Sequence, residues 1–377
     1  MPRTDDGAWD VLVVGRGPAG LAAAITSRRA GLSVAVAGLA DAVPRWGETL
    51  SASCHPLLCR LGIGDELRSE HHLSLRGVRS AWGMGAAQER SSIFHPYGES
   101  AILDRARFDR RLESVFQSDG GIVMEGRMQS VRFDGALHVL TLRDGQCGKQ
   151  LKAKGIIDAT GIAAHVARRL GARRITQTRQ VAIGCCFEAP PGITDHPTTA
   201  IVEGVELGWL FAVPVPMGGV AVWLVCDPAQ AAQDGAMKRA LRASQEVSRW
   251  LRSLQLQLRS KLVLRNASVG KLDRVTGAGW IAVGDAALSL DPMSSSGVTL
   301  AMLSGLHGGA AIAAWLSGDS DQLAGYAQTL QNAAEHHVEL RQRLYRAERR
   351  WPRADFWMPR QNLGFTAEDD YDSLGRY

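Results

Sequence analysis

Three glycines near the start of the chain have the spacing of a phosphate-binding loop. Gly15, Gly17 and Gly20 stand in the stretch Gly-Arg-Gly-Pro-Ala-Gly, directly after the strand-like run Asp-Val-Leu-Val-Val. In such a loop the first glycine permits a tight turn, the second lets the backbone approach a pyrophosphate, and the third allows a helix to pack closely on a strand. The N–H groups at the start of that helix would face the phosphates. The pattern predicts a dinucleotide site, and a glycine-rich turn without a ligand is the alternative.

A second loop, far along the chain, can hold another part of such a ligand. The run 280–283 has the composition of a buried strand, it ends in Gly284-Asp285, and a Pro-Met-Ser-Ser-Ser-Gly loop then leads into a helix. An aspartate at a strand end can accept hydrogen bonds from ribityl or ribose hydroxyls. The N–H groups of the loop and the helix N-terminus can stabilise negative charge, which a reduced flavin carries at N1 and at the C2 carbonyl. Two loops of this kind favour FAD over NAD.

With Asp-Ala-Thr-Gly at 158–161, these loops resemble the FAD-dependent monooxygenases of the p-hydroxybenzoate hydroxylase type and their tryptophan halogenase relatives. The stretch 46–63 is similar to the Gly-Glu-Ser/Thr segment that those proteins place beside the isoalloxazine ring, and 103–112 contains their Arg-x-x-Phe-Asp segment. The resemblance covers nearly the whole chain and implies that FAD is the cofactor. The cofactor-binding residues that it implies are Gly15, Gly17, Pro18, Ala19, Gly20, Asp41, Arg45, Glu48, Thr49, Leu50, Arg105, Thr160, Gly161, Gly284, Asp285, Pro292, Ser295, Ser296, Gly297 and Val298.

One position departs from the family pattern. The acidic residue that binds the adenosine ribose is expected at the end of the second strand, where this chain has Gly38. Asp41 is the nearest substitute, and Arg45 or backbone groups are the alternatives. We expect flavin occupancy after purification to report how much this loss matters.

The resemblance also bears on the reaction. The flavin hydroxylases of this superfamily use a flavin C4a-hydroperoxide as the electrophile, and the protein supplies a dry cavity and orientation. The halogenases use a lysine in the segment after the Gly-Glu motif, whereas this chain has no lysine before Lys149. The resemblance therefore favours hydroxylation of an aromatic ring. A halogenase stays open because 295–297 resembles a halide-binding Ser/Thr-Gly, and a geranylgeranyl-reductase-like oxidoreductase and a non-catalytic flavin-binding partner protein stay open too.

A narrower resemblance concerns the substrate. The stretches 77–83 and 346–357, with the Gly-Glu and Asp-Pro loops, are similar to flavoproteins that hydroxylate tryptophan during the maturation of tryptophylquinone cofactors. This similarity implies that the substrate is an indole ring, carried by a tryptophan of a partner protein or peptide, and that molecular oxygen is consumed. The sequence has no second nicotinamide motif. The reductant would then be NAD(P)H bound transiently, or reduced flavin from a separate reductase.

Four residues are candidates for the catalytic site. Glu48 would lie near the flavin as an acid–base or positioning group, or it would cap the following helix. Trp82, His95 and Tyr97 fall in the segment expected to line the substrate, where aromatic rings could stack on an indole. His95 could act as a general base. Ordinary packing is the alternative for each of these three, as it is for Trp209 and Phe211, which the resemblance places as a wall beside the flavin.

The elements that must position these residues follow from the hydrophobic pattern. Runs 10–14 and 32–37, with an Ala-rich run 18–30 between them, predict a βαβ unit. The spacing of apolar residues predicts helices over 104–116, 228–258 and 298–317, and a long helix from about 320.

Cofactor motifs alternate along the chain with strand-rich segments, which predicts an α/β (α+β) fold with one domain inserted into another. We expect a discontinuous, Rossmann-like FAD-binding domain, an inserted and mainly antiparallel β-sheet substrate domain, and a C-terminal helix and tail. The predicted boundaries are 1–62, 99–174 and 276–318 for the first, 63–98 and 175–275 for the second, and 319–377 for the third.

Composition argues against several other classes. A net charge of +5 is too weak to indicate nucleic acid. The uncharged stretch 207–226 has the length of a membrane span, but two prolines and two glycines interrupt it, so it predicts two strands and no membrane span. The six cysteines form no Cys-x-x-Cys pair. We therefore expect reduced thiols in a cytoplasmic protein and no metal site.

Overall fold

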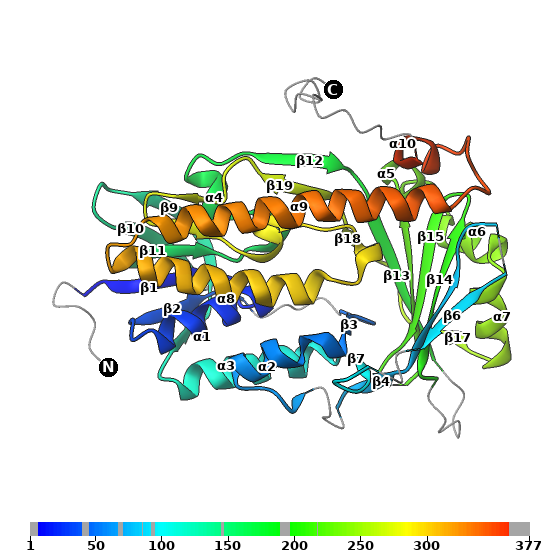
Figure 1. Ribbon diagram of the computed structural model, residues 1–377, viewed down its shortest axis with the longest axis horizontal. Helices are drawn as coiled ribbons and strands as arrows, with labels where there is room; N and C mark the ends of the chain where they lie inside the picture. The colour runs from blue at the N-terminus through cyan, green and yellow to red at the C-terminus, as the bar shows by residue number, and fades with distance from the viewer. Residues whose placement is uncertain are drawn as a thin grey trace.

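The computed structural model describes residues 7–39, 45–66, 71–84, 86–91, 95–144, 147–188, 197–216 and 218–361. Two large sheets form the two ends of the molecule, and a long helix, α9 (Asp321–Ala347), runs from one to the other (Figure 1). The predicted α/β class is confirmed. Two smaller three-stranded sheets lie between the large ones.

The first large sheet has a parallel centre. Its parallel strands run in the order β21-β11-β1-β2-β8, and both faces of β1 are covered, as expected for an apolar run without alternation. The antiparallel strands β9 and β10 pair with one another and with the first half of β11, and β20 pairs with β21. The bounds are β1 (Trp9–Val14), β2 (Val34–Ala37), β8 (Ile122–Met124), β9 (Arg127–Phe133), β10 (His138–Asp144), β11 (Cys147–Asp158), β20 (Thr276–Gly277) and β21 (Trp280–Ala282).

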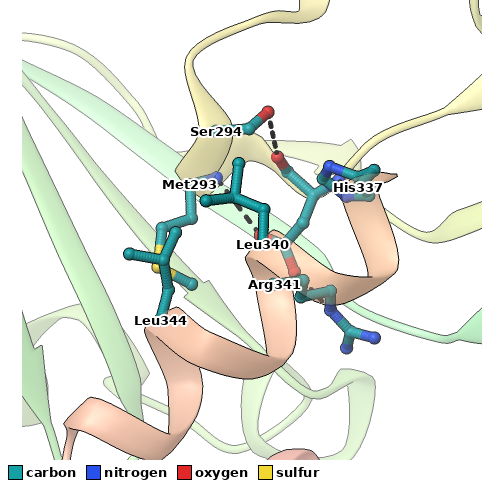
Figure 2. A pocket seen from close by; sticks show the side chains of 7 residues that line it. Met293, Ser294, His337, Leu340, Arg341 and Leu344 are labelled. Carbon is teal, nitrogen blue, oxygen red and sulfur yellow. Dashed lines mark hydrogen bonds and ion pairs between the residues drawn. The ribbon is translucent and has the colours of Figure 1, made fainter. Parts of the chain in front are cut away.

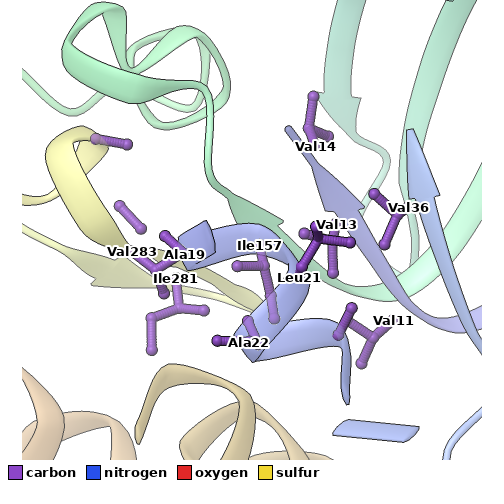
Figure 3. Packing of buried hydrophobic residues seen from close by; sticks show 14 of the residues in the cluster. Val11, Val13, Val14, Ala19, Leu21, Ala22, Val36, Ile157, Ile281 and Val283 are labelled. Carbon is purple, nitrogen blue, oxygen red and sulfur yellow. The ribbon is translucent and has the colours of Figure 1, made fainter. Parts of the chain in front are cut away.

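Helices α1 (Pro18–Arg29) and α8 (Gly297–Leu316) pack together against this sheet. Side chains of α1 meet those of β1, β11 and β21 in one apolar cluster (Figure 3). A Cβ at Gly305 of α8 would stand 2.2 Å from the carbonyl oxygen of Ala19, so only glycine permits this approach. Among the described helices, α8 has the length and apolar composition of a membrane span, but 56% of its most apolar window is buried inside the protein.

The second large sheet carries the strands that the sequence places in the inserted segment. Its order is β17-β13-β16-β15-β14-β5-β6, with β18 also paired to β13, and all pairs except β14 with β5 are antiparallel. The stretch 207–226 forms the β15–β16 hairpin, so the prediction of two strands is confirmed. The bounds are β5 (Gly77–Ala81), β6 (Gln88–Ser91), β13 (Val181–Glu188), β14 (Thr199–Val205), β15 (Gly208–Pro214), β16 (Val220–Cys226), β17 (Gln257–Leu258) and β18 (Val263–Asn266).

The prediction of a single helix over 228–258 is wrong. The chain forms α5 (Pro228–Ala231), α6 (Ala236–Ala243) and α7 (Glu246–Ser253) before it enters β17. The buried carboxylate of Glu203 on β14 accepts hydrogen bonds from the backbone N–H groups of Gln245 and Val247, at 2.6 and 2.9 Å. Because these are donors of a first helical turn, a distant side chain starts a new helix there.

The two small sheets straddle the predicted domain boundaries. One contains β3 (Thr49–Leu50), β7 (Ser100–Ile102) and β4 (Leu73–Leu75), and the other β12 (Arg174–Thr178), β19 (Val269–Leu272) and β22 (Leu288–Ser289). Both join segments assigned to different domains, so that division stays a prediction. The remaining α-helices are α2 (His55–Leu61), α3 (Arg105–Ser118), α4 (His165–Arg169) and α10 (Trp357–Gln361).

Candidate functional site

The three glycines in the loop between β1 and α1 have the roles expected of them. Gly15 has φ +119°, and a Cβ there would stand 2.1 Å from the carbonyl oxygen of Ala159. A Cβ at Gly20 would stand 2.1 Å from the carbonyl oxygen of Gly15, so helix α1 can start only if this residue is glycine. A Cβ at Gly17 would meet no atom within 4 Å. The second glycine therefore borders open space at the N-terminus of α1, where a pyrophosphate could approach.

The second glycine loop lies against the first. Gly284 begins the short helix η4 (Gly284–Ala286), and a Cβ on it would stand 2.6 Å from Cβ of Ala19 in α1. Its N–H donates to Oγ of Ser304 in α8 at 2.8 Å. The neighbouring Asp285 is exposed, although the surrounding protein raises the pKa of its carboxyl, an effect that Arg174, Arg45 and Arg105 oppose. Two motifs from opposite ends of the chain thus form one surface.

The Asp-Ala-Thr-Gly segment closes the same surface from β11. Ala159 is the residue that contacts Gly15. Asp158 is fully buried and accepts hydrogen bonds from N and Oγ1 of Thr160 and from N of Ala167, at 2.9, 2.6 and 2.8 Å. Burial raises the pKa of this carboxyl. Asp158 therefore shapes the turn and caps α4, while Thr160 and Gly161 stay half-buried beside the loop.

Glu48 and Arg105 form an ion pair that joins the Gly-Glu segment to α3. Strand β3, which contains Thr49 and Leu50, pairs with β7 just before α3 begins. The side chain of Arg105 is 4% exposed and also contacts Asp109 at 3.1 Å, while Arg45 lies 4.0 Å from Glu48. Glu48 does not cap a helix here. It belongs to a charged cluster whose arginines also act on Asp285.

An arginine lies next to the position where the acid is missing. A Cβ on Gly38 would stand 3.4 Å from Cγ of Arg16, the residue between the first two glycines of the loop. The Arg16 guanidinium donates to both carboxylate oxygens of Glu113 on α3 at 2.9 and 3.0 Å, and it lies 3.7 Å from Glu125. Asp41, the expected substitute, lies outside the described residues.

Pro292, Ser295, Ser296, Gly297 and Val298 belong to the loop before α8 and to the first turn of that helix. Pro292 starts the short helix η5 (Pro292–Ser294), Ser295 has φ +50°, and a Cβ on Gly297 would meet nothing within 4 Å. Sγ of Cys54, in the segment after β3, lies 2.9 Å from Oγ1 of Thr299. This contact ties the Gly-Glu segment to the first turn of α8.

The other three catalytic candidates lie at two separate places. Trp82 packs edge-on against Tyr345 and Trp357 in an aromatic cluster with the C-terminal helices, and its Nε1 donates to the Leu344 carbonyl at 2.7 Å. His95 and Tyr97 instead lie with their ring centroids 5.9 Å apart, and Tyr97 stacks on His55 of α2. No ring contact between described residues joins the two groups.

The two aromatic residues predicted to form a wall beside the flavin differ in burial. Trp209 is buried in the same C-terminal aromatic cluster, and its Nε1 donates to Oη of Tyr345 at 3.3 Å. Phe211, two residues along β15, is half-buried between two apolar clusters. The structure thus puts Trp209 in the core, and the role of Phe211 stays a prediction.

Sequence reasoning missed two residues that hold the site. The Arg174 guanidinium donates to the carbonyls of Asp285 and Ala286, at 2.9 and 3.2 Å, so it fixes the η4 turn. Asp291, buried before η5, receives hydrogen bonds from helix α9. The sequence shows a cluster of arginines at 168–174. Their spacing does not indicate that one of them donates hydrogen bonds to backbone carbonyls.

These features fit FAD. Gly17 and Gly297 leave open backbone at the N-termini of two long helices, and four guanidinium groups stand near the Asp285 carboxylate or the first glycine loop. Helix N-termini and cations are what a pyrophosphate and a reduced flavin need. We find no group of three potential metal-ligating side chains within the described part of the chain.

Models of two known protein families match this chain. The family model for tryptophan halogenase matches residues 71–368, and a model for an FAD-binding domain matches residues 10–44. The chain belongs to the tryptophan halogenase family. FAD is therefore its cofactor, and its chemistry is that of an FAD-dependent oxidoreductase.

Curated relatives extend over most of the chain. LodB of Marinomonas mediterranea, inferred to be an FAD-dependent oxidoreductase, is 26% identical over 94% of this chain and 97% of its own length. The menaquinone reductase of Mycobacterium tuberculosis is 30% identical over 80% of this chain and 75% of its own length. The relatives of this chain thus carry names for different activities.

Solved structures confirm the fold. The flavin-dependent halogenase CmlS superposes with a TM-score of 0.84 and 25% identity, over 97% of this chain and 70% of that protein. The peptidyl tryptophan dihydroxylase QhpG, essential for tryptophylquinone cofactor biogenesis, superposes with a TM-score of 0.75 and 24% identity, over 94% of this chain and 79% of its own.

Proposed function

We propose that this chain is an FAD-dependent monooxygenase that hydroxylates the indole ring of a tryptophan residue in a partner polypeptide, during formation of a quinone cofactor. Bound FAD, reduced by NAD(P)H or replaced by reduced flavin from a separate reductase, supplies the oxygen-activating chemistry. The residues of this chain bind and orient the flavin and exclude water from it. The similarity to LodB over nearly its whole length supports an FAD-dependent oxidoreductase, and the fold shared with QhpG supports the choice of substrate.

The positions of the lysines are the reason that we propose hydroxylation and not halogenation. The segment from β3 through η1 (Ala52–Cys54) and α2 contains no lysine, and the six lysines of the chain all lie at 149 or beyond. Lys154 is paired with Asp10 at 3.0 Å, and Lys271 donates to Oε1 of Gln331 at 2.6 Å. A halogenase of this type would need a lysine amine where this chain offers Ser51, Ser53 and Cys54.

Glu48 is the carboxylate best placed for a proton-handling or positioning role. It lies between Arg45 and Arg105, and it is about one third exposed. A carboxylate in this position can contact the substrate or the flavin, and it is a group that can accept a proton. His95 and Tyr97 lie with His55 near α2, and we assign them to the substrate side of this site.

The deciding experiment is mass spectrometry of a candidate partner polypeptide after co-expression with this chain, and with its Glu48→Ala variant as a matched control. Tryptophan that gains oxygen only with the active chain supports the proposal. Chlorine or bromine bound to the indole ring would show a halogenase, and reduction of a menaquinone by the purified protein would show an activity like the one named for the mycobacterial relative. Purified protein that binds FAD but consumes neither NAD(P)H nor oxygen would show a flavin-binding protein without this activity.

A further inference from the structure

Helix α9 holds the loop before α8 from behind through one buried carboxylate. Asp291 is 1% exposed, and its Oδ2 accepts hydrogen bonds from Nε of Arg341, Oη of Tyr345 and Nε2 of Gln180, at 3.0, 3.1 and 3.2 Å. Its Oδ1 accepts from the N–H of Met293 at 3.2 Å, inside the loop itself. The same carboxylate therefore caps η5 and receives donors from outside the loop.

The backbone of Asp291 is held as well. Its N–H donates to Nε2 of His337 in α9 at 2.8 Å. Nε2 must be unprotonated to accept this bond, and burial lowers the pKa of His337, which keeps the ring neutral. Figure 2 shows His337 and Arg341 on successive turns of α9, in the region that the loop residues Met293 and Ser294 also line.

The network continues into the C-terminal helix and the second large sheet. Arg360 of α10 donates to Oε1 of Gln180 and to Oδ1 of Asp227, at 3.2 and 2.7 Å, and it is 4% exposed. Trp209 of β15 donates to Oη of Tyr345. Buried charges that are paired in this way hold their neighbours in one arrangement, because moving any member leaves a charge without a partner in the interior.

Apolar packing and hydrogen bonds together hold the loop on this side. Met293 packs against the apolar cluster that contains Tyr345 and Trp357, and Leu340 and Leu344 of α9 lie next to Met293 and Ser294. Ser295 has φ +50°, a left-handed conformation that a non-glycine residue keeps only when its surroundings determine it. The hydrogen bonds to Asp291 supply the polar contacts between α9 and this loop.

We propose that Asp291, His337 and Arg341 are positioning residues, which set the loop 292–297 and the N-terminus of α8 at the place where they face FAD. They do not touch the cofactor; they act through the loop. The C-terminal helices then contribute to FAD binding by positioning this loop. This inference rests on FAD binding and not on the substrate, so it stands or falls independently of the proposed hydroxylation.

The test compares FAD affinity, the visible absorption spectrum of protein-bound FAD and the melting temperature of FAD-free protein. His337→Leu keeps the bulk of the ring but removes the acceptor, whereas His337→Gln restores an acceptor. We expect His337→Leu and Arg341→Met to raise the FAD dissociation constant by about tenfold, the effect of one lost hydrogen bond to a charged or backbone group. The bound-flavin spectrum should shift in both variants and return toward wild type in His337→Gln.

Arg76→Met is the matched control, because it removes an exposed ion pair with Glu99 that involves neither α9 nor the loop 292–297. FAD affinity and spectrum should not change. If Arg341→Met does not fold, Tyr345→Phe decides in its place, since it removes one donor to Asp291 and leaves the ring. Folded His337→Leu and Tyr345→Phe proteins with wild-type affinity and an unshifted spectrum at saturating FAD would overturn the proposal. Lower melting temperature alone, without a spectral shift, would also overturn it.

Discussion

Arg105, at the first position of α3, forms an ion pair with Glu48, the residue just before β3. The pair is possible because β3 and β7 run side by side, so that the Gly-Glu segment and the start of α3 meet although more than fifty residues separate them. Arg105 also opposes the rise in the pKa of Asp285 that desolvation causes. One guanidinium therefore connects three of the motifs that the sequence presents separately.

Replacing Arg105 by Met should weaken FAD binding. The variant loses a buried cation that faces the site, so we expect the FAD dissociation constant to rise by about tenfold or more, as for loss of a charged hydrogen bond. Flavin fluorescence titration measures this. Arg107→Met is the control on the same helix, since Arg107 is half exposed and pairs with Asp104. Equal affinity in both variants would exclude Arg105 from the site.

Gly17 offers a test that separates binding from folding. Its φ is −82°, an ordinary value, and a Cβ would meet nothing within 4 Å. We expect Gly17→Ala to fold with wild-type stability and to lose FAD, because the methyl group would stand where a pyrophosphate approaches the backbone. Gly20→Ala should fail differently: its Cβ would stand 2.1 Å from the Gly15 carbonyl oxygen, so the fold itself should be destabilised. Thermal unfolding of FAD-free protein distinguishes the two.

Local sequence patterns predicted those elements whose conformation depends on residues close to them in the chain. The glycine loop, the βαβ unit and the β15–β16 hairpin all follow from spacing and turn residues within about 30 positions. The helix break near Gln245 does not follow from local spacing, because the carboxylate that caps α7 comes from Glu203 on another element. Arg174 and Asp291 were missed for the same reason: their partners are carbonyls and side chains that only the tertiary fold brings near.

Trp82 illustrates the opposite difficulty. An aromatic residue in a substrate segment can stack on a ligand or on the protein, and its type does not tell the two apart. The C-terminal helices supply Tyr345 and Trp357 as partners for this ring. Such a pairing depends on where α9 ends relative to the second sheet, which no periodicity in the sequence encodes.

Trp357 should be one of the most sensitive positions for stability. Its side chain is fully buried, and Nε1 donates to the carbonyl of Val205 at 2.8 Å. Trp357→Ala removes this bond and leaves a cavity, so we expect the free energy of unfolding to fall by about 3–5 kcal/mol. Met358→Ala, at an exposed neighbour, should cost less than about 0.5 kcal/mol. Urea denaturation of both variants checks the difference.

Acidification should destabilise the protein through its buried histidines. Burial lowers the pKa of His72, His138 and His337 below their ordinary 6.5. The unfolded chain therefore binds protons first as the pH falls below about 6.5, and stability falls with it until the native rings are protonated. Each histidine contributes at most about 1.4 kcal/mol per pH unit.

His337 allows this effect to be isolated. Asp291 raises its pKa, while Arg341 and His336 add to the lowering by burial. The difference in unfolding free energy between wild type and His337→Gln cancels the other titrating groups, and it should change between pH 7.5 and 5.5 in the direction that makes the variant relatively more stable in acid. A difference that stays constant over this range would mean that His337 titrates alike in both states.

Gly38 gives a gain-of-function prediction. A side chain is allowed there, because the residue lacks a positive φ and its Cβ would lie at a contact distance of 3.4 Å from Arg16. Gly38→Asp would restore the carboxylate that FAD-binding relatives use for the adenosine ribose, so we expect FAD to bind about tenfold more tightly, the value of one charge-assisted hydrogen bond. Gly325→Asp, on the exposed side of α9, is the control for added charge.

The competing outcome is that the new carboxylate pairs with Arg16 and draws it from Glu113. FAD affinity would then stay at the wild-type value, and Gly38→Asp combined with Arg16→Met would be needed to recover the gain. If neither variant binds FAD more tightly, the adenosine is held by groups away from the end of β2.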